Sequence, residues 1–173
     1  MKRLFLLRHA KSSWDHPGLS DERRPLNARG ERDAPQMGRA ISERHSTLTL
    51  HVSPATRAQQ TAEGVLVGWR GNQLPICHTV DALYTFSAQC LVAWIHSQPG
   101  SMDSLVLVSH NPGLTDLINW LDPAAGLDNL PTAAWAELQL QVDLWSSVTR
   151  GCGELTFLLR PRELKALAGE ASQ

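Results

Sequence analysis

The sequence predicts a single three-layer α/β domain, in which a mixed, mainly parallel sheet carries helices on both faces. Short apolar runs alternate along the chain with amphipathic segments of helical period, which is typical of parallel strands joined by crossover helices. The uninterrupted apolar run at residues 105–108 is typical of a strand covered on both faces. A chain of 173 residues can bury one sizeable core, so we expect one domain over residues 1–165 and a C-terminal tail over residues 166–173.

Composition excludes several classes of protein. The hydrophobic fraction of 42% and the charged fraction of 19% are ordinary for a globular protein. A net charge of −1 gives no reason to expect binding to nucleic acid or to an anionic membrane. The N-terminal apolar run is too short for a signal peptide or a membrane span, and three cysteines without C-x-x-C spacing predict neither a disulfide framework nor a zinc site. We therefore expect a cytoplasmic protein; its oligomeric state is left open.

The first predicted strand ends in a charged pair. Residues 4–7 are all apolar, and Arg8 and His9 follow them directly. Residues 12–24 are polar and contain a Pro-Gly turn, so we expect a surface loop there. Ligands bind at the carboxyl ends of strands in open α/β sheets, which makes this pair a candidate for function.

A helix is expected after the loop. Asn27 is a suitable N-cap for a helix that extends to about residue 44. Pro35 falls inside this window, which predicts either a kink or a later start near Asp33. Residues 48–52 then form a short predicted strand.

The next helix is predicted from the pair Ser53-Pro54. Serine is a favoured N-cap and proline a favoured first helical residue, so we expect a helix from there to about residue 67. Residues 76–80 are expected to form a strand, and residues 87–96 a third helix with one apolar face.

The last third of the chain predicts one more helix and two more strands. Asn111-Pro112, after the strand at 105–108, repeats the cap-plus-proline pattern and predicts a helix to about residue 121. Residues 134–141 alternate between apolar and polar, and residues 154–159 are again mostly apolar. We expect these two strands to pair as an antiparallel edge beside the parallel centre.

Two arginines and two histidines are expected to meet at one edge of the sheet. Arg8 and His9, Arg57 and His110 all lie just after predicted strands, and parallel strands bring their carboxyl ends together. Arg57 would lie in the first turn of its helix, where free N–H groups and the helix dipole favour an anion. Guanidinium groups match a tetrahedral oxyanion. The sequence therefore predicts a phosphate pocket built without a glycine-rich loop.

Other phosphate and hydrolase chemistries lack their motifs. No cysteine is followed six positions later by arginine, as a cysteine phosphatase loop requires. The patterns G-x-x-x-x-G-K-[ST], G-x-S-x-G and H-E-x-x-H do not occur either.

Several short runs, in order, resemble the histidine phosphatase superfamily. Three of them carry that resemblance: Leu-Arg-His-Ala at 7–10, where the RHG motif is expected, Ser-Pro-Ala-x-Arg-Ala-x-x-Thr at 53–61, and Val-Ser-His-Asn-Pro-Gly at 108–113. Two more resemble its SixA-type phosphohistidine phosphatase branch: Ser-Asp-x-x-Arg-Pro-Leu-x-x-Arg-Gly at 20–30 and Ala-Leu-Tyr at 82–84. The resemblance covers about residues 3–160 and implies a phosphoglycerate mutase-like fold.

The resemblance also implies a mechanism. His9 would be the nucleophile and form a covalent phosphohistidine, which water then cleaves. Three residues, Arg8, Arg57 and His110, would hold the non-bridging oxygens and stabilise their charge. Because arginines supply the positive charge, neither a metal nor a cofactor is expected. Ser13 and Asn111 are further candidates for binding the substrate.

The proton donor is less well defined. Sibling branches use an acidic residue to protonate the leaving oxygen, and the candidates are Asp81 and Asp21. Either also fits a surface or capping carboxylate. A histidine nitrogen, with an ordinary pKa of about 6.5, leaves with far less help than an alkoxide. The resemblance therefore favours phosphohistidine on proteins such as phosphotransfer domains; the alternatives are a small-molecule phosphomonoesterase for sugar, nucleotide or acyl phosphates, and an inactive phosphate-binding module.

Overall fold

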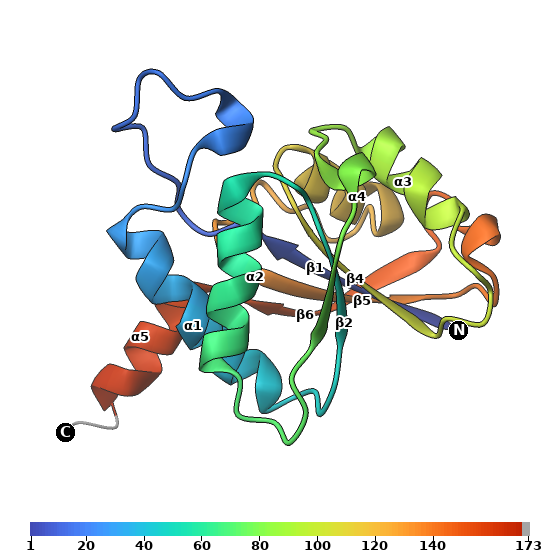
Figure 1. Cartoon of the computed structure of the whole chain (residues 1–173). Coiled ribbons are helices and arrows are strands. Elements are labelled where there is room, and N and C mark those ends of the chain that lie inside the picture. The colour runs from blue at the N-terminus through green and yellow to red at the C-terminus, as the bar shows by residue number, and fades with distance from the viewer. Residues whose placement is uncertain (171–173) are drawn as a thin grey trace.

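Six strands form one mixed sheet at the centre of the structure (Figure 1). The structure is a computed structural model that describes residues 1–170, with side chains to residue 166. The strand order is β3-β2-β4-β1-β5-β6. The parallel strands are β1 (Lys2–Arg8), β2 (Thr49–Val52), β3 (Ile76–Thr79) and β4 (Ser104–Ser109). The antiparallel strands are β5 (Trp135–Leu140) and β6 (Gly153–Leu159), so the predicted antiparallel edge is confirmed.

Helices cover both faces of this sheet. One face carries α1 (Ala28–Ser42), α2 (Thr56–Gly68) and α5 (Pro161–Glu170); the other carries α3 (Ala88–His96) and α4 (Gly113–Leu121). Three 3₁₀ turns complete the elements: η1 (Asp21–Arg23), η2 (Asp81–Leu83) and η3 (Trp145–Ser147). The predicted α/β class is confirmed. Among the helices that are described, none has the length and apolar character needed to cross a membrane.

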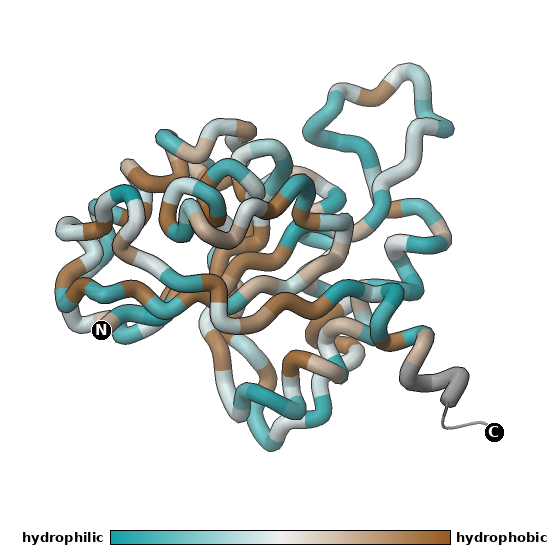
Figure 2. Tube along the Cα trace, turned by 180° about the vertical axis from the view of Figure 1, so that it is seen from behind, coloured by the Kyte–Doolittle hydropathy of each residue, from teal (hydrophilic) through white to brown (hydrophobic). Residues whose placement is uncertain are grey.

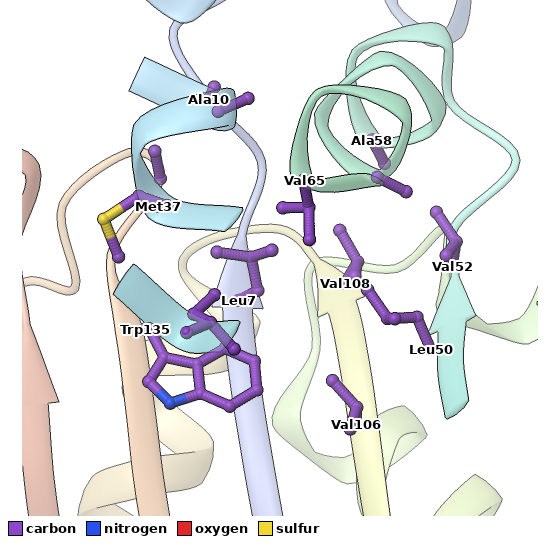
Figure 3. Close-up of a cluster of buried hydrophobic side chains, with 14 of the residues drawn as sticks. Leu7, Ala10, Met37, Leu50, Val52, Ala58, Val65, Val106, Val108 and Trp135 are labelled. Atoms are coloured by element: carbon purple, nitrogen blue, oxygen red, sulfur yellow. The ribbon is translucent and has the colours of Figure 1, made fainter. Parts of the chain in front are cut away.

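The central strand β1 contributes to two hydrophobic cores. Successive side chains of a strand point to opposite faces, so Phe5 and Leu7 pack beneath α1 and α2, while Leu4 and Leu6 pack beneath α3 and α4. Figure 3 shows Leu7 in the first of these cores, and all four side chains are at most 3% exposed. This double burial explains why the strand is a continuous apolar run.

The predicted N-cap of α1 is present, and the alternative prediction, a helix that starts near Asp33, is wrong. Asn27 accepts a hydrogen bond from the Gly30 amide at 3.0 Å, and the helix begins at Ala28 with Pro35 inside it. Helices α1 and α2 pack backbone against backbone beside this proline. A Cβ atom at Gly68 would overlap the carbonyl oxygen of Pro35, so only glycine permits this approach.

The ends of two helices differ from prediction. Helix α2 begins at Thr56 with Ala55 as its N-cap residue, two residues after the predicted start at Pro54, and the Ser53 hydroxyl contacts a histidine ring. Helix α5, which the sequence did not reveal, continues to Glu170 and crosses the expected boundary between domain and tail at residue 166. Residues 171–173 of that expected tail lie outside the described residues.

A buried carboxylate links α1 to β5 and gives a test of stability. Glu137 accepts hydrogen bonds from Arg44 at 2.8 and 3.0 Å, from His45 at 3.0 Å and from the Trp135 indole at 2.9 Å. Burial alone would raise the pKa of Glu137, but these bonds hold it below its usual range. We expect Glu137→Gln to lower the free energy of unfolding by about 1.5–3 kcal/mol in urea denaturation. The exposed Glu154→Gln is the control, and equal stabilities would contradict the expectation.

Candidate active site

Three predicted site residues meet at the carboxyl-end edge of the parallel strands. His9 follows β1, His110 follows β4, and Arg57 lies in the first turn of α2. The two imidazole ring centroids are 5.1 Å apart, and Arg57 Nε lies 3.4 Å from His9 Nε2. Arg8 adds a second guanidinium: burial, and then the charge of Arg57, lower its pKa. The structure thus brings all four predicted residues to one place.

The His9 ring has a defined proton arrangement. Its Nδ1 lies 2.7 Å from the carbonyl oxygen of Ala10, which can only accept, so Nδ1 carries the hydrogen. Nε2 is then the unprotonated nitrogen, and Arg57 Nε donates to it. Burial lowers the pKa of His9 to about 3; the Ala10 bond opposes this, and the nearby His110, Arg57 and Arg8 add to it. At neutral pH the ring is uncharged and its Nε2 lone pair is available.

His110 is held from the opposite side of the site. Ser53 Oγ accepts a hydrogen bond from the Ala55 amide at 3.3 Å and lies 2.7 Å from His110 Nε2. The Ser53 hydroxyl has no other acceptor among the described residues, so it donates to Nε2. The ring hydrogen then lies on Nδ1, which is buried and has no partner in the described part of the chain. The rings of Tyr84 and Phe86 pack against the imidazole at 5.4 and 5.5 Å between centroids.

The two imidazoles give a prediction on pH. Burial and nearby arginines also lower the pKa of His110 to about 3. We expect the NMR signals of both rings to show no protonation near pH 5, whereas in urea-unfolded protein they titrate around the ordinary value of about 6.5. Because the unfolded chain then binds more protons, stability should fall as the pH drops from about 6.5 towards 3. Titration of either ring near 6.5 in the folded protein would contradict this.

Asp21, on η1, anchors Arg57. The Arg57 side chain is 2% exposed; its Nη1 donates to the Asp21 carbonyl at 2.6 Å and its Nη2 to the Asp21 carboxylate at 2.9 Å. The same carboxylate accepts from the Tyr84 hydroxyl at 2.8 Å and from Arg24 Nε at 3.2 Å. Burial alone would raise the pKa of Asp21, but the bonds from Tyr84, Arg57 and Arg24 lower it to about 2. An ionised carboxylate has no proton to give, so this geometry fits an anchor better than a proton donor.

The other donor candidate, Asp81, stays a prediction. It is exposed on η2, and within the described residues its carboxylate has no hydrogen-bond partner. Ser13 is buried in the loop between β1 and α1, where its hydroxyl accepts from the Asp15 amide at 3.1 Å. No hydrogen bond joins Ser13 to the His9 ring among the described side chains, and the expected role of Ser13 in binding substrate stays a prediction.

Asn111 has a structural position. Its amide nitrogen donates to Asn129 Oδ1 and to the Leu130 carbonyl, each at 2.9 Å, and its Oδ1 accepts from the Thr115 amide at 3.2 Å. The Leu130 carbonyl also accepts from Arg8 Nη1 at 2.9 Å. Asn111 therefore fixes the segment that holds Arg8, and its expected contact with the substrate stays a prediction.

Some residues that shape the site were missed in the sequence. Thr61 Oγ accepts from the Ala10 amide at 2.9 Å and donates to the Arg57 carbonyl at 2.6 Å. It therefore links the segment after His9 to the first turn of α2. Ala10 stands at the third position of the expected RHG motif and is fully buried. Thr61 and Tyr84 end two of the runs that carried the resemblance, and that was the only signal for them. No group of three or more potential metal-ligating side chains occurs in the described part of the chain.

The family comparison agrees with this geometry. The sequence model of the histidine phosphatase superfamily (branch 1) matches residues 4–79, which include His9, Asp21 and Arg57. A SixA phosphohistidine phosphatase assigned in Agrobacterium tumefaciens has the same fold, with a TM-score of 0.74 and 26% identity over 92% of this chain and 98% of that one. In sequence over residues 4–79 and in fold over nearly its whole length, the chain is similar to members of the histidine phosphatase superfamily.

Two other solved structures share this fold, and a plant protein is similar in sequence. The protein histidine phosphatase SixA complexed with tungstate matches with a TM-score of 0.76 and 23% identity, covering 94% of this chain and 99% of that one. An Escherichia coli protein assigned as an α-ribazole-5′-P phosphatase matches with a TM-score of 0.68 and 20% identity, covering 93% and 98%. An uncharacterized chloroplastic protein of Arabidopsis thaliana is 29% identical over 132 residues, which is 72% of this chain but only 61% of that protein.

Proposed function

We propose that the protein is a phosphatase that removes the phosphoryl group from phosphohistidine on proteins, through a covalent intermediate on His9. One observation carries the proposal: the unprotonated Nε2 of His9 faces a site in which Arg8 Nε and His110 Nδ1 are buried without partners among the described residues. Buried N–H groups need acceptors. The oxygens of a phosphoryl group at His9 Nε2 would supply them.

The first step transfers the phosphoryl group to the enzyme. The Nε2 lone pair of His9 attacks phosphorus, and the bond between phosphorus and the substrate nitrogen breaks. Arg57 and Arg8 stabilise the charge on the phosphoryl oxygens, since positioning and electrostatics dominate this chemistry. The His9 ring gains positive charge as the bond forms, and the Ala10 carbonyl at Nδ1 stabilises that charge.

The second step hydrolyses the intermediate. A water molecule attacks phosphorus from the opposite side, and the bonding pair returns to His9 Nε2. The water loses its proton to solvent, and inorganic phosphate leaves. The neutral His9 ring is restored with its hydrogen still on Nδ1, ready for the next substrate.

The state of Asp21 supports phosphohistidine as the substrate. With its pKa near 2, Asp21 does not protonate a leaving group at neutral pH. A substrate imidazole that is protonated on its other nitrogen leaves as a neutral ring without help from an enzyme acid. An alkoxide from a sugar or nucleotide phosphate requires that help.

The anchoring role of Asp21 predicts a loss that does not depend on the leaving group. We expect Asp21→Asn to lower kcat/KM about tenfold for both phosphoramidate and phosphoserine, because Arg57 loses its charged partner. If Asp21 were the proton donor, the loss would instead concentrate on phosphoserine, which has the poorer leaving group. Asp15→Asn, an exposed carboxylate of the same loop, is the matched control.

Substrate choice can be tested directly. The enzyme is given a phosphorylated histidine phosphotransfer domain, phosphoramidate and a panel of sugar and nucleotide monoesters, and kcat/KM is compared. The proposal expects the phosphorylated domain to be the best substrate. Rapid hydrolysis of a small monoester while the domain keeps its label would instead favour a small-molecule phosphatase, as in the Escherichia coli relative. Absence of turnover on every substrate would indicate a binding module. A cytoplasmic location stays a prediction from the sequence.

A further inference from the structure

A second cavity lies at the same edge of the sheet as His9. Strand β6 runs antiparallel to β5, and β5 runs antiparallel to β1, so β6 ends where β1 ends. Residues Arg160 and Arg162, which follow β6, therefore lie on the carboxyl-end edge, where α5 begins beside α1 (Figure 1).

This cavity has two adjoining parts. The larger, of about 420 Å³, lies between the two arginines and the segment 125–131. The smaller, of about 120 Å³, lies between the same arginines and the side of α1. Both parts share three lining residues, Pro131, Arg160 and Arg162. We call the whole the Arg162 cavity.

The Arg162 cavity has an excess of cations. Its basic side chains are Arg29, Arg160, Arg162 and Lys165. The buried carboxylate of Asp33 is shared by Arg29 at 3.4 Å and Lys165 at 3.3 Å.

The two arginines after β6 differ in how they are neutralised. Arg160 pairs with Glu163 at 3.1 Å. Arg162 is exposed and has neither an ion pair nor a hydrogen bond from its side chain within the described residues. Besides Asp33, the acidic residue Asp128 lines the cavity. Although the whole chain carries a net charge of −1, the cavity leaves a guanidinium free for an anion.

Residues 129–131 lie between the Arg162 cavity and the site around His9. Asn129 and Pro131 line the Arg162 cavity, and the carbonyl of Leu130 between them accepts the hydrogen bond from Arg8. A protein that presents a phosphohistidine to His9 would therefore bring its neighbouring surface over the Arg162 cavity.

We propose that the Arg162 cavity binds carboxylates on the protein that carries the phosphohistidine. The inference rests on the proposed function. An open cavity of this size admits acidic side chains, and charges around a binding site steer the approach of an oppositely charged partner. The cavity thus selects acidic protein substrates, while His9 and the arginines next to it act on the phosphoryl group.

The test uses paired peptides. One phosphohistidine peptide has glutamates beside the phosphohistidine, and its partner has glutamines at the same positions. For Arg162→Glu, we expect the ratio of kcat/KM for the acidic peptide to that for the neutral peptide to fall about tenfold at low salt, and Arg162→Gln to lie between. Arg150→Glu is the matched control, since Arg150 is exposed in the turn before β6, at the opposite edge of the sheet. An unchanged ratio would overturn the inference.

A second measurement separates this inference from the proposed function. The unphosphorylated acidic peptide, labelled with a fluorophore, should bind the wild-type protein more tightly than the neutral peptide does, and Arg162→Glu should remove the difference. Such binding without turnover of either phosphopeptide would support the cavity and contradict the phosphohistidine substrate. Turnover of the phosphopeptides with equal binding of both unphosphorylated peptides would support the phosphohistidine substrate and contradict the role of the cavity.

Discussion

A His9→Ala variant is expected to lose at least about a thousandfold in kcat on phosphoramidate, because no other group supplies the attacking lone pair. The ring is uncharged, and the Ala10 carbonyl fixes its hydrogen on Nδ1. Rapid quenching of the wild-type enzyme should trap an acid-labile phosphoryl group on His9, and the variant should trap none.

Two controls make this result specific to His9. The exposed His16→Ala should keep the wild-type rate. His9→Ala itself should still bind tungstate, measured by calorimetry, because Arg8 and Arg57 remain. A labelled phosphoryl group on the alanine variant, or turnover above a tenth of the wild-type rate, would remove His9 from the nucleophile position.

Replacement of Arg57 by lysine is expected to be nearly as severe. The guanidinium directs Nε at His9, Nη1 at the Asp21 carbonyl and Nη2 at the Asp21 carboxylate. A lysine ammonium is a single point charge and cannot reproduce this fork. Loss of such a transition-state contact costs about 2.7–4 kcal/mol, so we expect Arg57→Lys to lower kcat/KM on phosphoramidate about 100- to 1,000-fold.

The charge-conserving change at an exposed site provides the comparison. Arg70→Lys, just after the end of α2, should leave kcat/KM unchanged, since the Arg70 side chain donates hydrogen bonds to the nearby carbonyls of Val67 and Trp69. The Arg57→Lys protein should also lose affinity for tungstate. A lysine variant that keeps more than about a tenth of the wild-type kcat/KM would show that the fork is not needed.

The sequence predicted the sheet because its strands are strongly patterned. Double burial of the strand around Leu6 requires an apolar residue at every position, and this pattern can be seen without coordinates. Strand β5 alternates between apolar and polar residues in sequence, although all of its residues except Gln139 are buried in the structure. Helix α5 was missed because it is short and its C-terminal half falls in the segment that was expected to be a tail.

The site was predictable where function follows strand ends and not where it depends on side-chain reach. His9 and His110 follow strands directly, so topology alone places them together. The role of Asp21 depends on a contact with Arg57, which is 36 positions later in the chain. Ser53 fits a helix cap equally well in the sequence, and only the position of the His110 ring shows its other role.

The loop between β1 and α1 projects from the domain and is largely hydrophilic along its length (Figure 2). A β-bridge between Ser12 and Leu26 closes the base of this loop. The guanidinium carbon of Arg24 lies 3.6 Å from the centroid of the Trp14 ring, and Arg24 Nε donates to the Asp21 carboxylate. Residues 15–19 are exposed between these fixed points. Insertions or grafted sequences at 15–19 would therefore change the surface that a binding partner contacts and leave the site around His9 unchanged. The tip of this loop is thus a suitable place to engineer new selectivity.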